Sequence, residues 1–196
     1  MIELRELVAA ALRLQQAWQE DGTPFCFIGG LAVQRWSEPR FTRHVDATIF
    51  VGFGGERAAA VTQLQRAKGR IQDPIGFAIL NRVLLLEDSH GCPIDLALGA
   101  MPFEQEMIQR SQSEVIDPNQ PPIRICSASD LVILKAFAGR PQDWIDIRGT
   151  LIRSKNLLDW SLIQRELDVL LELKEEPESM ERLLSLKTAS NKSPQP

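Results

Sequence analysis

Residues 25–51 read FCFIGGLAVQRWSEPRFTRHVDATIFV and contain the clearest fold signal in the chain. The apolar run 25–28 predicts a strand, Gly29 and Gly30 predict a tight turn, and residues 31–36 have helical spacing. Such a turn lets phosphate oxygens approach backbone N–H groups. A glycine pair after a strand is also typical of a plain turn, so this motif alone does not define a phosphate site.

A group of metal ligands is predicted where the next strand, 45–51, begins. His44 and Asp46 are two residues apart, so on a strand both side chains project to the same face. Asp95 lies in the apolar run 94–98, where an ionised carboxylate is costly unless it is paired or coordinates a cation. We therefore predict that His44, Asp46 and Asp95 hold a metal-bound triphosphate, although a salt bridge also explains Asp95.

The remaining patterns predict an α+β chain with two parts. Short apolar runs predict further strands at 77–80, 82–86 and 94–98. From Ser127 onward these runs stop, and apolar residues recur at helical spacing. We therefore expect a mixed-sheet domain at 1–125, a helical subdomain at 126–188 and a polar, disordered tail at 189–196.

Composition limits the function classes. The chain has 196 residues, 44% of them hydrophobic, which is enough for one sizeable core. The net charge of -4 argues against a protein that coats nucleic acid. The three cysteines form no CxxC pair and favour reduced thiols in the cytoplasm. The first twenty residues resemble neither a signal peptide nor a membrane span, so no membrane association is expected.

Three motifs in order resemble a known family. The Gly-Gly turn, the segment PRFTRHVD and an isolated acidic residue in a later strand resemble the nucleotidyltransferase superfamily that shares the polymerase β palm. The segments GGLAVQRWSEPRFTRHVD, IDLALGAMPFE and SASDLVILKAFAGRPQDWIDI are similar to AbiEii-type bacterial nucleotidyltransferases of toxin–antitoxin and phage-abortive systems. The resemblance covers roughly residues 25–150. It implies NMP transfer from a nucleoside triphosphate to an RNA, protein or small-molecule hydroxyl, and an antitoxin partner.

The resemblance also implies a role for each matching residue. Asp46 and Asp95 are the expected catalytic carboxylates, and with the residue at position 44 they hold Mg²⁺ or Mn²⁺. Lys135 is the expected phosphate or base contact, oriented by Asp143 or Asp146, although an interhelical ion-pair network is the alternative. The full set of expected nucleotide-binding residues is Gly29, Gly30, Arg40, Thr42, Lys135, Arg140, Asp143 and Asp146.

The sequence departs from the family pattern at its first metal-ligand position, where His44 replaces an aspartate. A neutral imidazole supplies one nitrogen and removes a full negative charge, and Mg²⁺ prefers oxygen ligands. We therefore expect either a different metal or weak catalysis. The alternative function is a catalytically degenerate protein that binds nucleotide or a protein partner as a regulator.

Overall fold

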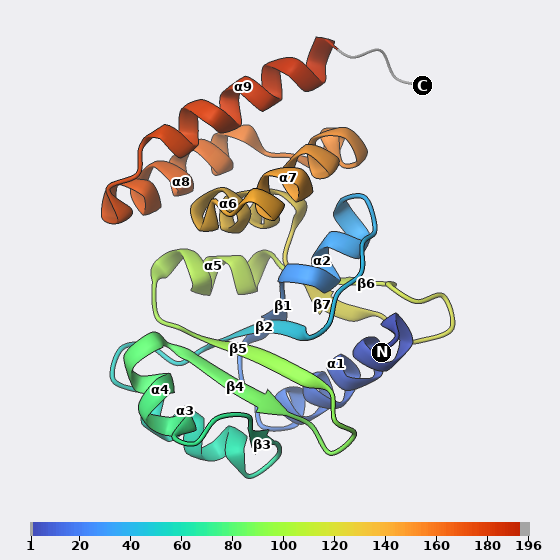
Figure 1. Ribbon diagram of the computed structural model, residues 1–196, viewed down its shortest axis with the longest axis vertical. Helices are drawn as coiled ribbons and strands as arrows, with labels where there is room; N and C mark the ends of the chain where they lie inside the picture. The colour runs from blue at the N-terminus through green and yellow to red at the C-terminus, as the bar shows by residue number, and fades with distance from the viewer. Residues whose placement is uncertain (1, 193–196) are drawn as a thin grey trace. The chain divides into compact units, whose positions relative to one another are not determined.

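The computed structural model describes residues 2–192, without the side chains of residues 191 and 192. Its helices are α1 (Leu4–Glu20), α2 (Gly29–Trp36), α3 (Glu56–Leu64), α4 (Pro74–Asn81), α5 (Pro102–Arg110), α6 (Ala128–Ala138), α7 (Pro141–Arg153), α8 (Trp160–Lys174) and α9 (Glu178–Lys192) (Figure 1). Its strands are β1 (Phe25–Phe27), β2 (Val45–Phe50), β3 (Lys68–Gly69), β4 (Val83–Glu87), β5 (Pro93–Gly99), β6 (Gln112–Glu114) and β7 (Ile123–Ile125). A short 3-10 turn covers Lys155–Leu157.

The chain divides into two compact units. One contains residues up to Leu31 and Arg40–Cys126, and the other contains Ala32–Pro39 and the chain from Ser127 onward. The second unit thus includes residues 32–39, which the predicted boundary after residue 125 assigns to the first domain. Helix α2 begins in the first unit and ends in the second.

The seven strands found among the described residues form one mixed sheet in the order β3-β4-β5-β2-β1-β7-β6. Two neighbouring pairs, β2 with β5 and β1 with β7, are parallel, and the other pairs are antiparallel. The expected α+β class is therefore confirmed. The sequence patterns also locate β1, β2, β4 and β5, but they do not predict the short strands β3, β6 and β7.

The strand predicted at 77–80 is wrong, because these residues belong to α4. Local capping explains the difference. The Asp73 side chain accepts a hydrogen bond from the Gly76 N–H, and Pro74 occupies the first helical turn. Arg82 ends the helix in the left-handed conformation, with φ 53°. Periodicity cannot separate a short apolar helix from a buried strand, whereas these caps can.

The two faces of the sheet have different neighbours. Helices α1 and α5 lie on opposite faces (Figure 1). On the α1 face, Trp18 packs against Phe25 and Phe27, with ring centroids 5.1 and 5.9 Å apart. The apolar residues of β2 on this side, such as Ala47, are fully buried. Burial of each large apolar side chain on this face, such as Phe27, contributes roughly 1.5–3 kcal/mol, so this face forms the core of the unit.

The second unit is helical, as expected. Ser127 caps α6 by accepting from the Asp130 N–H at 3.1 Å, and Gly139 ends this helix with φ 68°. Ser37 donates to the carbonyl of Asp146 at 2.8 Å, which fastens residues 32–39 to α7. Helix α9 continues through residues 189–192, the first part of the predicted disordered tail, and residues 193–196 lie outside the described residues.

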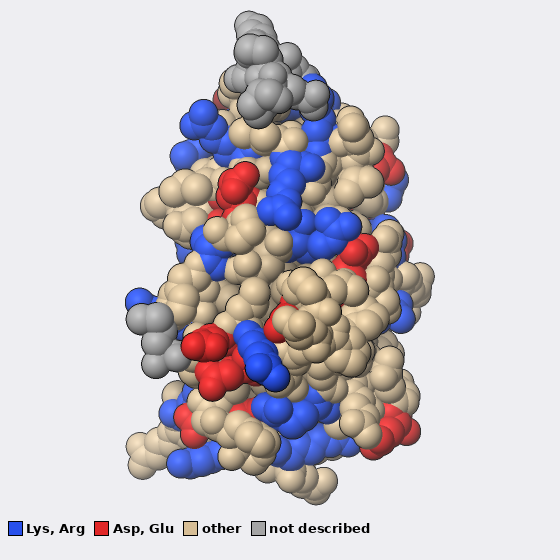
Figure 2. Space-filling model, turned by 90° about the vertical axis from the view of Figure 1, so that its right-hand side faces the viewer, with Lys and Arg blue, Asp and Glu red and all other residues tan. Residues whose placement is uncertain are grey.

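None of the helices within residues 2–192 is both long and apolar enough to cross a membrane. On the face drawn in Figure 2, both basic and acidic side chains occur.

Candidate metal and nucleotide site

Two neighbouring parallel strands bring the predicted metal ligands together. Asp46 on β2 lies directly opposite Asp95 on β5, so both side chains project from the same face of the sheet. His44 precedes β2 by one residue, and its Nε2 lies 3.1 Å from Asp46 Oδ1 and 3.8 Å from Asp95 Oδ2. One donor atom from each of the three residues lies within 4.8 Å of the others.

A fourth side chain, Arg70, contacts this group. The backbone N–H of Arg70 donates to the carbonyl of Leu85 at 3.0 Å, and Leu85 lies opposite Asp95. Leu85, Asp95 and Asp46 therefore form one row across β4, β5 and β2, and Arg70, one residue after β3, lies at the Leu85 end of this row. The Arg70 guanidinium reaches along this row, forms an ion pair with Asp95 and donates to the carbonyl of Ile94 at 3.3 Å. No sequence pattern indicates Arg70, because its place depends on the pairing of a two-residue strand.

The glycine turn fits closely around Asp46 and Thr42. Gly29 has φ +54°, and a Cβ atom there would lie 2.2 Å from Asp46 Oδ2. A Cβ atom at Gly30 would lie 2.2 Å from Thr42 Oγ1. The Gly30 N–H donates to Asp46 Oδ2 at 3.1 Å. The missing side chains therefore let the turn hold the Asp46 carboxylate, and one of its N–H groups is already engaged with that carboxylate.

The electrostatics of the site favour a protonated His44. The hydrogen bond to Asp46 raises the pKa of His44, burial opposes this, the charges of Asp46 and Asp95 add to the increase, and Arg70 reduces it. The His44 imidazole contacts both carboxylates, and Arg70 contacts that of Asp95. A bound cation must therefore compete with groups that the chain itself supplies.

The donor set still fits one divalent cation. Asp46 and Asp95 supply carboxylate oxygens, and His44 supplies an imidazole nitrogen within the same 4.8 Å group. Mn²⁺ accepts such a mixed set more readily than Mg²⁺, which prefers oxygen. A two-ion site needs carboxylates that bridge both ions, and His44 cannot bridge as a carboxylate does. The residues therefore fit a single cation better than a pair.

Comparison with solved structures identifies the fold. A crystal structure of an antigenic nucleotidyltransferase-like protein from Paracoccidioides brasiliensis matches 95% of this chain and 95% of its own, at 16% identity and a TM-score of 0.58. The chain has a nucleotidyltransferase fold. A solution structure of the antibiotic-resistance factor ANT(2'')-Ia matches at 17% identity and a TM-score of 0.48, with 95% and 96% covered. A crystal structure of ANT(2")-Ia in complex with adenylyl-2"-tobramycin matches at 15% identity and a TM-score of 0.44, with 96% and 95% covered.

The match to the Paracoccidioides brasiliensis protein establishes the nucleotidyltransferase fold and nothing finer, because its identity is only 16%. No model of a known protein family matches the chain, and no curated protein matches it. The resemblance to AbiEii-type nucleotidyltransferases therefore stays a prediction.

The other predicted nucleotide-binding residues fall into two groups. Thr42 lies beside the glycine turn and donates weakly to the carbonyl of His44 at 3.4 Å. Arg40 is in the same unit, and its Nη1 donates to the carbonyl of Phe41 at 3.2 Å. The remaining four residues belong to the helical unit.

Those four residues form an ion-pair cluster on α6 and α7. Lys135 Nζ lies 2.7 Å from Asp143 and 2.7 Å from Asp146, and both aspartate side chains are 2% exposed. Arg140 Nε lies 2.8 Å from Asp143, while its own side chain is 74% exposed. The expected pairing of Lys135 with the two aspartates is present, and it is also the pairing expected of an interhelical network. A nucleotide-binding role for this cluster stays a prediction.

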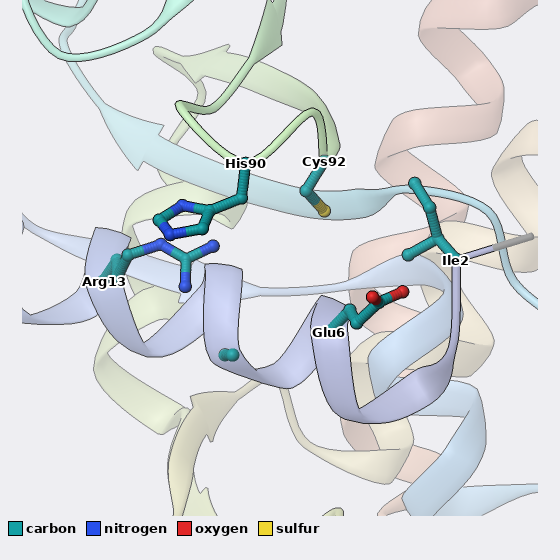
Figure 3. Close-up of a pocket in the computed structure, with 6 residues that line it drawn as sticks. Ile2, Glu6, Arg13, His90 and Cys92 are labelled. Carbon is teal, nitrogen blue, oxygen red and sulfur yellow. The ribbon is translucent and has the colours of Figure 1, made fainter.

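A separate pocket of about 220 Å³ lies between α1 and the turn that joins β4 to β5 (Figure 3). Arg13, His90 and Cys92 line it, and Arg13 forms an ion pair with Asp88. Burial, assisted by the charge of Asp88, raises the pKa of Cys92 to about 11. The Cys92 thiol is therefore a poor nucleophile.

Proposed function

We propose that this chain binds a nucleoside triphosphate with one divalent cation and transfers NMP to a hydroxyl group. The observation that supports this most directly is the convergence of His44, Asp46 and Asp95 donors within 4.8 Å on one face of a nucleotidyltransferase-fold sheet. Asp46 and Asp95 would hold the cation, with His44 as a nitrogen ligand. When bound, the cation supplies positive charge that offsets charge developing on the phosphates.

The chain's own residues account for the remaining chemistry. The acceptor hydroxyl oxygen bonds to the α-phosphorus while the bond from that phosphorus to the leaving oxygen breaks, and pyrophosphate departs. Asp95 is the carboxylate that takes the hydroxyl proton, since the Gly30 N–H engages Asp46. Asp95 must first separate from Arg70, because an ion-paired carboxylate is a weaker base.

A second function, nucleotide binding without transfer, is favoured by a different observation. His44 and Arg70 already satisfy both carboxylates by contacts within the chain. Such internal pairing is what a degenerate, regulatory nucleotidyltransferase would retain after losing a metal ligand. RNA, a protein hydroxyl and a small molecule are the acceptor classes for the active form. An antitoxin partner and a cytoplasmic location rest only on sequence patterns and stay predictions.

Two measurements on the full chain distinguish these functions. Calorimetric titration with each of the four common nucleoside triphosphates, with Mn²⁺ present, should give binding that Asp95→Asn weakens. The control Asp21→Asn removes a carboxylate that pairs with Arg66 away from the site and should have no effect. Transfer of label from α-³²P triphosphate to RNA, protein or an aminoglycoside then separates the enzyme from the regulator. Absence of binding for all four triphosphates at millimolar concentration would refute both functions.

A further inference from the structure

The edge of the sheet beside the candidate site carries a second group of charges. Lys68 on β3 lies opposite Glu87 on β4, which lies opposite Pro93 on β5. Arg70 follows two residues after Lys68, so both side chains belong to the same face as Asp95. These two rows place Lys68 and Arg70 next to the carboxylate pair, on the side away from β1.

A polar pocket of about 300 Å³ opens at this edge, lined by Lys68, Gly69, Arg70 and Glu87. Two of these side chains are cationic and one is anionic, so the lining carries a net positive charge. Arg70 lines the pocket and also pairs with Asp95, which makes it the physical link between the pocket and the metal ligands. No sequence motif points to this pocket.

The contacts of Arg70 change when Asp95 binds a cation. A divalent cation on Asp95 removes the negative partner of the guanidinium and repels it. The Arg70 side chain is 28% exposed and has only one other hydrogen-bond partner in the described structure, the carbonyl of Ile94 at 3.3 Å. A planar guanidinium released in this way presents several donors, and a phosphate group can accept two of them at once.

Phosphate binding also requires donors beyond the glycine turn. The Gly30 N–H is already donated to Asp46, so that N–H is not free for a ligand. Arg70 and Lys68 are cationic groups on the same face as the carboxylates, and Arg70 contacts Asp95 directly.

From this geometry we infer that Arg70 changes its binding partner when ligand binds and that the pocket it shares with Lys68 is a phosphate subsite. Without ligand, Arg70 neutralises Asp95 and competes with the divalent cation. With ligand, Arg70 leaves Asp95 and binds a phosphate group of the triphosphate. This inference rests on the proposed function, because it assumes that a cation and a triphosphate bind together at this face.

The inference predicts effects of opposite sign on two probes. Mn²⁺ binding to the full chain, followed by electron paramagnetic resonance of the free ion, should become about fivefold tighter in Arg70→Ala, since a competing charge is lost. Binding of inorganic triphosphate with Mn²⁺ present, followed by calorimetry, should become about fivefold weaker in the same variant. A residue that only supports the fold would weaken both.

Arg66→Ala is the matched control, because it removes an arginine that pairs with Asp21 elsewhere in the same unit. Arg70→Gln tests the same loss of charge with a side chain of similar length, in case the alanine variant misfolds. Changes of the same sign on both probes, or changes no larger than those of Arg66→Ala, would overturn the inference while leaving the proposed function intact. If neither the wild-type chain nor Arg70→Ala binds either probe, the proposed function fails and this inference fails with it.

Discussion

Gly29→Ala tests whether the glycine turn is shaped around Asp46. Gly29 has φ +54°, and an added Cβ would lie 2.2 Å from Asp46 Oδ2. The left-handed conformation costs a non-glycine residue about 1–2 kcal/mol. Moving the Asp46 carboxylate away also breaks its hydrogen bond from the Gly30 N–H, and a bond to a charged group contributes about 1.5–3 kcal/mol. The free energy of unfolding should therefore fall by about 2.5–5 kcal/mol.

Gly22→Ala is the matched control for this substitution. Gly22 has φ +69°, but an added Cβ there meets nothing within 4 Å. This variant should lose only the conformational part, about 1–2 kcal/mol. Urea unfolding followed by far-ultraviolet circular dichroism measures both losses, and Mn²⁺ titration should show weaker binding only for Gly29→Ala. Equal losses of stability with unchanged Mn²⁺ affinity would refute the account of the turn.

Three further substitutions test other parts of the account. His44→Asp should raise Mg²⁺ affinity about tenfold by calorimetry, because it replaces a nitrogen ligand with a carboxylate, which adds a negative charge and the oxygen donor that Mg²⁺ prefers; unchanged or weaker binding would show that a carboxylate at position 44 does not reach the cation. Burial raises the pKa of Asp88, but the hydrogen bonds it accepts outweigh burial and hold the pKa below its usual value, so its contribution to stability is present above about pH 4 and lost as pH falls further. Asp88→Asn should therefore flatten the pH dependence of the unfolding free energy below about pH 4, and an unaltered dependence would exclude this role. Lys135→Met should lower the unfolding free energy by about 3–5 kcal/mol in urea titrations, because it leaves Asp143 and Asp146 buried without their cation, and a loss below about 1 kcal/mol would contradict the buried network.

Local sequence patterns were sufficient for the centre of the site. Residues two apart on a strand share a face, so His44 and Asp46 could be placed together from spacing alone. Asp95 could be added because a carboxylate in an apolar strand needs a partner. The structure brings one donor atom of each residue within 4.8 Å of the others, and their role as metal ligands stays a prediction.

The parts that could not be predicted depend on contacts between distant segments. Arg70 reaches Asp95 only through the pairing of β3 with β4 and of β4 with β5, and β3 is two residues long. Residues 32–39 join the helical unit through contacts such as that of Ser37 with Asp146, which no local pattern reveals. The apolar residues of the run 77–80 fit both a strand and a helix, and the Asp73 cap decides for the helix.

The central claim is that His44, Asp46 and Asp95 hold one divalent cation. The most direct test is a Mn²⁺ titration of the full chain and of the double variant Asp46→Asn/Asp95→Asn, followed by electron paramagnetic resonance of the free ion. The account predicts one Mn²⁺ bound per wild-type chain, and an affinity at least about tenfold lower in the double variant, since both carboxylate charges are lost. Equal Mn²⁺ binding by the two proteins, or no binding by either, would contradict it.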